Sequence, residues 1–225
     1  MSQTLSSRRM LVGVAVIALL AGCGKSDDDA STDPLDEDVM ADSELSGDAA
    51  GGETGLSTAQ RSPEAIAAAR QDAAKKAGGT LENASPAAGG EVASLFEGAA
   101  RAAQVSDQSR ADATDCAAKV AYSASWADRL PDALAVYPRA AVQEAAGVAA
   151  EDCAMNAVTF VTPVDAKDVI DYYYTRARKA GYGVDYLVEG GDHVLGGSNA
   201  GKAYVVSARS LEDGVTEVDL IASGK

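Results

Sequence analysis

The residues that could support chemistry are few and lie far apart in the chain. There are three cysteines, Cys23, Cys116 and Cys153, and a single histidine, His193. A lone histidine with no spare thiolate cannot build a typical zinc site without several carboxylates. His193 could act as the base of a serine hydrolase, but no Gly-x-Ser-x-Gly turn occurs to carry the nucleophile. The sequence therefore assigns no catalytic, cofactor-binding or metal-ligating residue, and we expect a protein that is not an enzyme.

Two further patterns could bind ligands, and each has a simpler structural interpretation. The glycine-rich stretch 196–201 resembles a phosphate loop, but it leads into no helix and lacks the Gly-Lys-Ser/Thr ending, which favours a hairpin turn. The run Tyr172-Tyr173-Tyr174 could form a stacking platform. Successive helical residues point about 100° apart, so we expect Tyr173 to pack inward while its neighbours flank the edge.

The N-terminus carries an export signal. Arg8 and Arg9 precede an apolar run of twelve residues, 10–21, whose helical length of about 18 Å is too short to cross a bilayer. Residues 1–22 therefore read as a signal peptide. The sequence Leu20-Ala21-Gly22-Cys23 resembles the lipobox of bacterial prolipoproteins. This resemblance implies cleavage before Cys23 and a diacylglyceryl group on its thiol, although an ordinary cleaved signal remains an alternative.

The resemblance also implies a location. Two or more acyl chains on Cys23 would anchor the protein in a lipid bilayer far more firmly than one. In the lipoprotein family an Asp after the lipidated cysteine favours the inner membrane, whereas Gly24 stands here. We therefore expect a lipid-anchored protein of the bacterial cell envelope, facing the periplasm or the surface, with the outer membrane slightly favoured. The stretch 7–12 also resembles a twin-arginine signal, so the general secretory and twin-arginine routes both stay open.

The next segment, 23–54, is strongly acidic. Between residues 24 and 54 there are eleven Asp and Glu residues, one Lys and no aromatic residue. Such a composition buries too little apolar surface to offset chain entropy, which predicts a disordered, self-repelling tether. A weak calcium site over 27–33 is an alternative, but the ligand spacing and turn glycine of an EF-hand are missing.

Residues 55–111 are rich in alanine. Ser62 followed by Pro63 is a competent helix start, and Gly78-Gly79 would end that helix. A second helical stretch, 91–104, carries an apolar face of Val92, Leu95, Phe96 and Ala99. Because Gly-Gly and Ser-Pro pairs separate these stretches, we expect a low-complexity linker with marginal helices. The second stretch could alternatively dock on a partner or on a membrane surface.

The folded domain is expected over 112–225, where the composition becomes typical of a core. This part contains Trp126, Phe160 and all eight tyrosines. It also contains Cys116 and Cys153, the even pair that remains once Cys23 is lipidated. In an exported protein two such cysteines most simply form a disulfide. A redox function is the alternative, but the pair does not form a Cys-x-x-Cys motif.

The periodicity of this domain predicts an α+β fold. The sequence 165–180 has a helical apolar face, and strands are expected at 141–146, 154–161, 183–188, 193–195, 203–209 and 216–222. A short helix is expected around Trp126, followed by a loop over 131–138. Glycines 190, 191, 196, 197 and 214 are expected in turns. Hairpin-length spacings after one helix favour a two-layer structure, with one main helix packed on an antiparallel sheet.

Three short motifs carry a second resemblance. Tyr137-Pro138, Phe160-Val161-Thr162 and Ala180-Gly181-Tyr182 resemble the entry, strand and helix end of small uncharacterised α+β domains of envelope lipoproteins. The likeness covers about residues 126–222. It implies the fold and transfers no functional residue.

Charge and composition narrow the function. The net charge of −15 disfavours nucleic acid as a partner, because a phosphate polymer would be repelled. We expect a non-catalytic interaction or structural module that binds a protein partner in the envelope. The alternative is a small-ligand-binding domain or weak hydrolase, with a pocket between helix and sheet lined by Tyr173, Tyr182, Tyr186 or His193.

Overall fold

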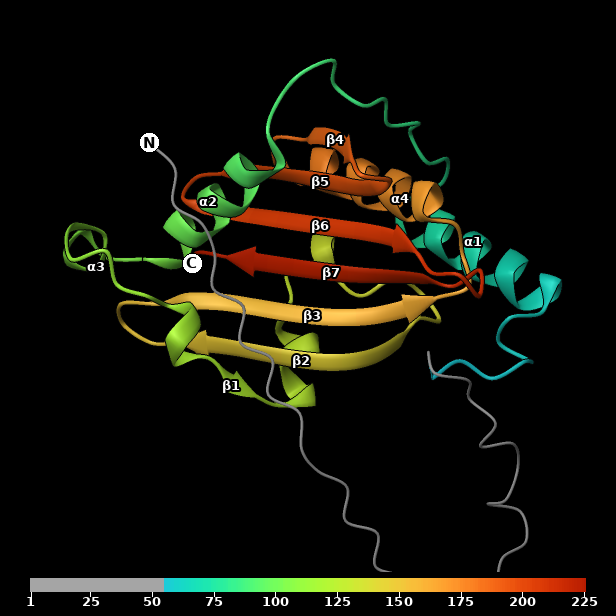
Figure 1. Cartoon of the computed structure of the whole chain (residues 1–225), viewed down its shortest axis with the longest axis horizontal. Helices are drawn as coiled ribbons and strands as arrows, with labels where there is room; N and C mark the ends of the chain where they lie inside the picture. The colour runs from blue at the N-terminus through green and yellow to red at the C-terminus, as the bar shows by residue number, and fades with distance from the viewer. Residues whose placement is uncertain (1–54) are drawn as a thin grey trace, which may run out of the picture. The chain divides into compact units, whose positions relative to one another are not determined.

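The computed structural model describes residues 55–225. The expected signal peptide, the acidic segment 23–54 and Cys23 lie outside the described residues. Figure 1 shows one seven-stranded antiparallel sheet in the order β1-β2-β3-β7-β6-β5-β4. The strands are β1 (Ala121–Tyr122), β2 (Ala141–Ala149), β3 (Ala154–Thr162), β4 (Asp185–Glu189), β5 (Asp192–Asn199), β6 (Lys202–Ser210) and β7 (Thr216–Ser223). The α+β class and the antiparallel sheet agree with the sequence-based prediction.

Most turns follow the glycines. Gly190 and Gly191 join β4 to β5 with φ of 63° and 99°, and Gly214 lies with a φ of 76° between β6 and β7. The β5–β6 turn is at 200–201, so Gly196 and Gly197, expected in a turn, are instead inside β5. Neither site leaves free space for a side chain, because an added Cβ would lie 3.1 Å from the Leu95 side chain at Gly196 and against the Gly183 backbone at Gly197.

Helix α4 (Ala166–Lys179) is the main helix that the sequence predicts. Its residues Val169, Ile170, Tyr173 and Ala177 are all fully buried against the sheet. They form one core with Phe160, Leu195, Tyr204, Val218 and Leu220. Gly181, with a φ of 81°, follows the helix in the left-handed conformation that commonly ends helices. We call this side of the sheet the α4 face.

Helix α1 (Pro63–Lys76) differs from the expectation of a linker. It starts as the sequence predicts, with Ser62 Oγ accepting from Ala65 N at 3.2 Å. Ala69 and Ala73 of this helix, and Ala77 directly after it, are buried and belong to the same core as α4. Small side chains let the two helices approach closely. Residues that look like a spacer by composition are therefore part of the fold.

The chain between α1 and α2 is held by hydrogen bonds to α4 and to the edge strand β4. Glu82 N donates to Thr175 Oγ1 at 2.7 Å, and Ala84 N donates to Asp171 Oδ1 at 2.7 Å. Further on, the amide of residue 87 donates to the carbonyl of residue 186 in β4 at 2.8 Å. This segment covers part of the exposed β4 edge, which would otherwise present unpaired backbone groups.

Helix α2 (Val92–Ala103) then lies on the opposite side of the sheet, across β5, β6 and β7 (Figure 1). Ala99 is buried there together with Val194 and Val205. The fold therefore has three layers, with α1 and α4 on one face and α2 on the other, where the sequence predicts two. The sequence predicts a single helical layer because the composition of residues 91–104 is typical of a linker. We call this second side the α2 face.

Short helical elements complete the structure: α3 (Asp107–Ala111), η1 (Ala117–Lys119), η2 (Ala124–Arg129) and η3 (Asp132–Leu134). The helix expected around Trp126 is η2, and the expected loop 131–138 contains η3. No helix within 55–225 is both long enough and apolar enough to cross a membrane.

Candidate functional site

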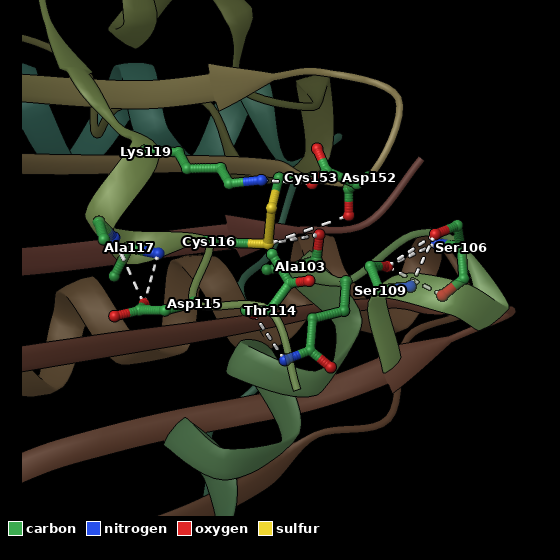
Figure 2. Close-up of polar contacts among 12 residues, drawn as sticks. Ala103, Ser106, Ser109, Thr114, Asp115, Cys116, Ala117, Lys119, Asp152 and Cys153 are labelled. Carbon is green, nitrogen blue, oxygen red and sulfur yellow. Dashed lines mark hydrogen bonds and ion pairs between the residues drawn. A yellow bond between two sulfur atoms is a disulfide. The ribbon is translucent and has the colours of Figure 1, made fainter. Parts of the chain in front are cut away.

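Cys116 and Cys153 form a disulfide, as the sequence predicts, with their α-carbons 5.5 Å apart. Figure 2 shows that the bond ties the loop after α3 to the hairpin between β2 and β3. Cys153 is fully buried, and Cys116 is 4% exposed. Cys116 Sγ also lies 3.5 Å from Ala103 O, so the end of α2 shields it. A covered bond of this kind acts as a structural crosslink rather than an accessible redox centre.

Polar contacts around the disulfide fasten the same segment (Figure 2). Gln104 Nε2 donates to Thr114 O at 2.9 Å, and Lys119 forms an ion pair with Asp152. The Lys119 ammonium lowers the pKa of the Asp152 carboxyl. These contacts connect α2, the loop and the β2–β3 hairpin into one unit, which places α2 firmly over the sheet.

His193 lies on the α4 face beside a tyrosine. His193 Nδ1 is 2.5 Å from the hydroxyl oxygen of Tyr186, and their rings are stacked with centroids 5.9 Å apart. Burial lowers the pKa of His193, the nearby Lys167 ammonium lowers it further, and Asp192 opposes the shift. Lys167 itself is paired with Asp171 at 2.6 Å. The imidazole is thus partly buried and held by packing, and its surroundings disfavour the imidazolium form.

The tyrosine run forms core rather than a platform. Tyr173 is fully buried, as expected, and donates its hydroxyl to Ala135 O at 3.1 Å. Tyr172 is also fully buried, which differs from the expected position at the edge, and it accepts from Arg176 Nη1 at 2.9 Å. Arg176 in turn pairs with Asp132 at 2.8 Å. Burial raises the pKa of Tyr173 well above its usual value.

The four residues expected to line a small-ligand pocket make different contacts in different parts of the structure. Tyr173 is packed in the core, and Tyr186 and His193 contact each other. Tyr182 packs edge-on against Tyr204, with ring centroids 5.4 Å apart, and lines a cavity near Trp126. Among these four described residues, only Tyr186 and His193 therefore share a hydrogen bond or a ring contact.

A groove of about 490 Å³ lies on the α2 face, between α2 and the strands. Its apolar wall includes Val92 and Phe96 of α2 and Ile221 of β7. Phe96 is 39% exposed, although it is a large aromatic side chain. The volume lies within the range of about 300–1,000 Å³ that is typical of ligand sites. The groove can therefore accept a side chain or a short segment of another molecule.

The rest of the groove is acidic. Glu189, Asp192 and Asp219 line it, and Thr159 Oγ1 donates to Asp219 Oδ1 at 2.7 Å. Arg209 also lies there, but it is paired with Glu217. Asp192 and Asp219 also attract this arginine, so it offsets part of their charge. With three carboxylates against one arginine, the lining keeps a net negative charge beside its apolar wall, which suits a ligand with an apolar part and a cation.

A sequence signal for this groove exists in the strand alternation. Residues two apart in a strand share a face, so Asp219 and Ile221 of β7 must lie together. The helical spacing of Val92 and Phe96 likewise predicts one face of α2. The sequence does not show that this face meets β7, because the contact joins segments more than 120 residues apart.

Cys23, the predicted lipidation site, lies outside the described residues. Within 55–225, no three His, Cys, Asp or Glu side chains are arranged to hold a metal ion. Comparisons with protein-family models, with curated proteins and with solved structures find no significant match for this chain.

Proposed function

We propose that the protein is a lipid-anchored component of the bacterial cell envelope whose folded part is a non-catalytic interaction module for a protein partner. The lipobox-like residues 20–23 support the anchor on acylated Cys23. The buried Cys116–Cys153 disulfide supports export, because such bonds form and persist in oxidising compartments. On this proposal the module faces the periplasm or the cell surface, with the outer membrane slightly favoured.

The observation that carries the interaction function is the groove on the α2 face. An exposed Phe96 beside Asp192 and Asp219 complements a partner segment that carries an apolar side chain next to a lysine or arginine. Binding suits this groove better than catalysis, because the one histidine of the chain, His193, contacts Tyr186 on the α4 face instead. We therefore assign the groove to a cationic, partly apolar segment of another envelope protein.

Site-specific photocrosslinking in the producing cells tests this assignment. A photoreactive phenylalanine analogue replaces Phe96 in the full chain, and the control carries it at Tyr122, which is 73% exposed on the edge strand β1. We expect position 96, and not position 122, to crosslink one reproducible partner peptide that contains a lysine or arginine. Equal crosslinking at both positions, or scattered partner peptides, would contradict the proposal.

A charge reversal supplies the second arm. Asp192→Lys should abolish the crosslink at position 96, because it places a cation where the partner's cation binds. Glu151→Lys, an equally large charge change at an exposed residue outside the groove lining, should leave the crosslink unchanged. Melting curves of both variants verify that each is folded. An unchanged crosslink in folded Asp192→Lys would refute the electrostatic part of the assignment.

A further inference from the structure

A separate cavity of about 220 Å³ lies where η2 meets the ends of β3, β6 and β7. Its lining includes three basic side chains: Arg129 from η2, Lys202 from the start of β6, and Lys225. No aspartate or glutamate lines it. In a chain with 34 acidic and 19 basic residues, a cavity whose charged lining side chains are all basic differs from the overall charge of the protein.

The contacts of these three basic side chains also differ from those of the other Lys and Arg residues in the domain. Residues 112–225 contain ten Lys and Arg residues. Six of them form ion pairs with described carboxylates, and Lys179 donates to the carbonyl of residue 77. The other three are Arg129, Lys202 and Lys225. Among the contacts between described residues, their side chains make no ion pair or hydrogen bond. Lys225 lies near enough to Asp152 to help lower the pKa of that carboxyl, whereas Arg129 and Lys202 have no carboxylate partner within 55–225. All three side chains line one cavity.

Arg129 is held in place by contacts that do not use its guanidinium N–H groups. Its guanidinium carbon lies 4.3 Å from the ring centroid of Trp126, a cation–π contact. Asn156 Nδ2 donates to the Arg129 carbonyl at 3.0 Å, which fixes the backbone at the end of η2. Trp126 packs directly over Gly147, where a Cβ would lie 2.5 Å from the indole. The stacked guanidinium therefore keeps its N–H groups available to a ligand at the cavity.

Size and charge indicate the ligand class. A cavity of about 220 Å³ is smaller than the usual site for a drug-sized molecule, so it suits a compact group. The fork geometry of arginine matches phosphate oxygens, and lysines complement it as point charges. Two or three cations match the double charge of a phosphate monoester better than the single charge of a carboxylate. Arg129 and Lys202 alone supply two positive charges, and Lys225, which also faces Asp152, adds a weaker third.

We propose that this cavity binds a phosphate group through Arg129, Lys202 and Lys225, beside the indole of Trp126. The phosphate comes either from a soluble monoester or from the headgroup of a membrane lipid. The proposal goes beyond the partner-binding function, because it uses a different cavity and different residues. Loss of one activity would leave the other intact.

Trp126 is the only tryptophan of the chain, so its fluorescence reports directly on this cavity. The full chain, produced with Cys23→Ala so that it stays unacylated, is titrated with inorganic phosphate and with glycerol 3-phosphate at constant ionic strength. Acetate is the matched monoanion. Calorimetry measures the same affinities without relying on the indole. We expect saturable binding of the phosphates and much weaker binding of acetate.

A second arm distinguishes the lipid source. Vesicles of phosphatidylcholine with phosphatidic acid, which presents a phosphate monoester, are compared with vesicles of pure phosphatidylcholine in sedimentation assays. Binding to the phosphatidic acid vesicles that glycerol 3-phosphate displaces identifies the cavity as the membrane contact. Saturable binding of the soluble phosphates without vesicle binding identifies a soluble ligand. Either result supports the proposal.

Matched variants test whether the cavity is responsible for phosphate binding. Arg129→Gln and Lys202→Gln should each weaken phosphate binding about tenfold, as expected when one charge-assisted hydrogen bond is lost. Lys76→Gln, which removes an exposed cation from α1, should have no effect. Because Arg129 and Lys202 are exposed, both variants should fold normally, which melting curves check. The proposal is overturned if phosphate and vesicles both fail to bind, or if binding is equal in all three variants.

Discussion

At the scale of single residues, glycines determine how closely segments approach. Gly197 in β5 faces the chain that leaves α4, and a Cβ added there would lie 1.9 Å from Gly183 O. Gly183 N donates to Ser198 O at 3.0 Å, which holds the two segments together. A glycine pair read from sequence alone indicates a turn, because turns are its commonest use. Only the path of the distant residue 183 shows that close backbone approach is the reason here.

Gly197→Ala is therefore expected to destabilise the protein by about 3 kcal/mol or more, since the added methyl group meets backbone rather than a movable side chain. Gly98→Ala in α2 is the control, because nothing lies within 4 Å of its added Cβ. That change should be neutral or stabilise the helix by up to about 1 kcal/mol. Urea denaturation measures both variants. Equal stability of Gly197→Ala and the parent chain would refute the close approach.

His193 offers a second test at this scale, because it is the only histidine and its NMR signals need no assignment. Burial and the Lys167 ammonium lower its pKa, so titration should give a pKa below the ordinary 6.5. Asp192→Asn removes the opposing carboxylate and should lower the pKa further. Since the folded state disfavours the imidazolium, the stability from His193 is complete above pH 6.5 and declines as the pH falls. A pKa at or above 6.5 would contradict the described environment.

At the scale of elements, the helices before residue 111 extend the fold beyond the part that the sequence identifies. Ala69, Ala73 and Ala77 bury little area each, so composition gives no sign that α1 packs on α4. The beginning and end of α1 are predictable, since Ser62-Pro63 and the glycines after it are strong signals. Whether such a helix docks depends on long-range contacts such as the Arg70–Asp168 ion pair at 2.6 Å. Local sequence carries no information about these contacts.

A glutamate scan of α1 tests this docking. Ala73→Glu places a carboxylate at a fully buried site against α4, and we expect it to destabilise the protein by about 3 kcal/mol or more. Ala67→Glu on the exposed side of the same helix should change stability by less than about 0.5 kcal/mol. Thermal melting of the full chain compares the two. Identical melting temperatures would mean that α1 is the linker that its composition suggests.

The disulfide is a second feature that determines how stably these elements are held together. Cys116 and Cys153 are 37 residues apart, and the chain-entropy estimate for closing such a loop is about 3–4 kcal/mol. The double variant Cys116→Ala with Cys153→Ala should lower the melting temperature by about 10 °C. Hydrogen exchange should accelerate most in the loop around residues 104–119. Full reduction of the parent chain is the control and should shift the melting temperature equally. An unchanged melting temperature in both cases would show that the bond contributes nothing to stability.

At the scale of the whole molecule, residues that the composition places in a linker belong to the fold, because α1 packs in the core with α4 and α2 packs on the opposite face of the sheet. The class of fold and helix α4 follow from the periodicity of the sequence. The cysteine pairing follows from an even pair of cysteines behind an expected export signal. The α2-face groove and the basic cavity do not follow from the sequence, because each joins residues from distant elements that no local pattern connects.

We propose that this chain is exported, anchored through Cys23 and closed by the Cys116–Cys153 disulfide, and that it binds a partner. Intact mass spectrometry of the protein from the membranes of producing cells, without reducing agent, tests this proposal beside the Cys23→Ala variant. We expect a mature chain that starts at Cys23, carries acyl mass and lacks two hydrogens at Cys116 and Cys153, while the variant carries no acyl mass. An unacylated product with both thiols free would contradict the anchor, the compartment and the function built on them.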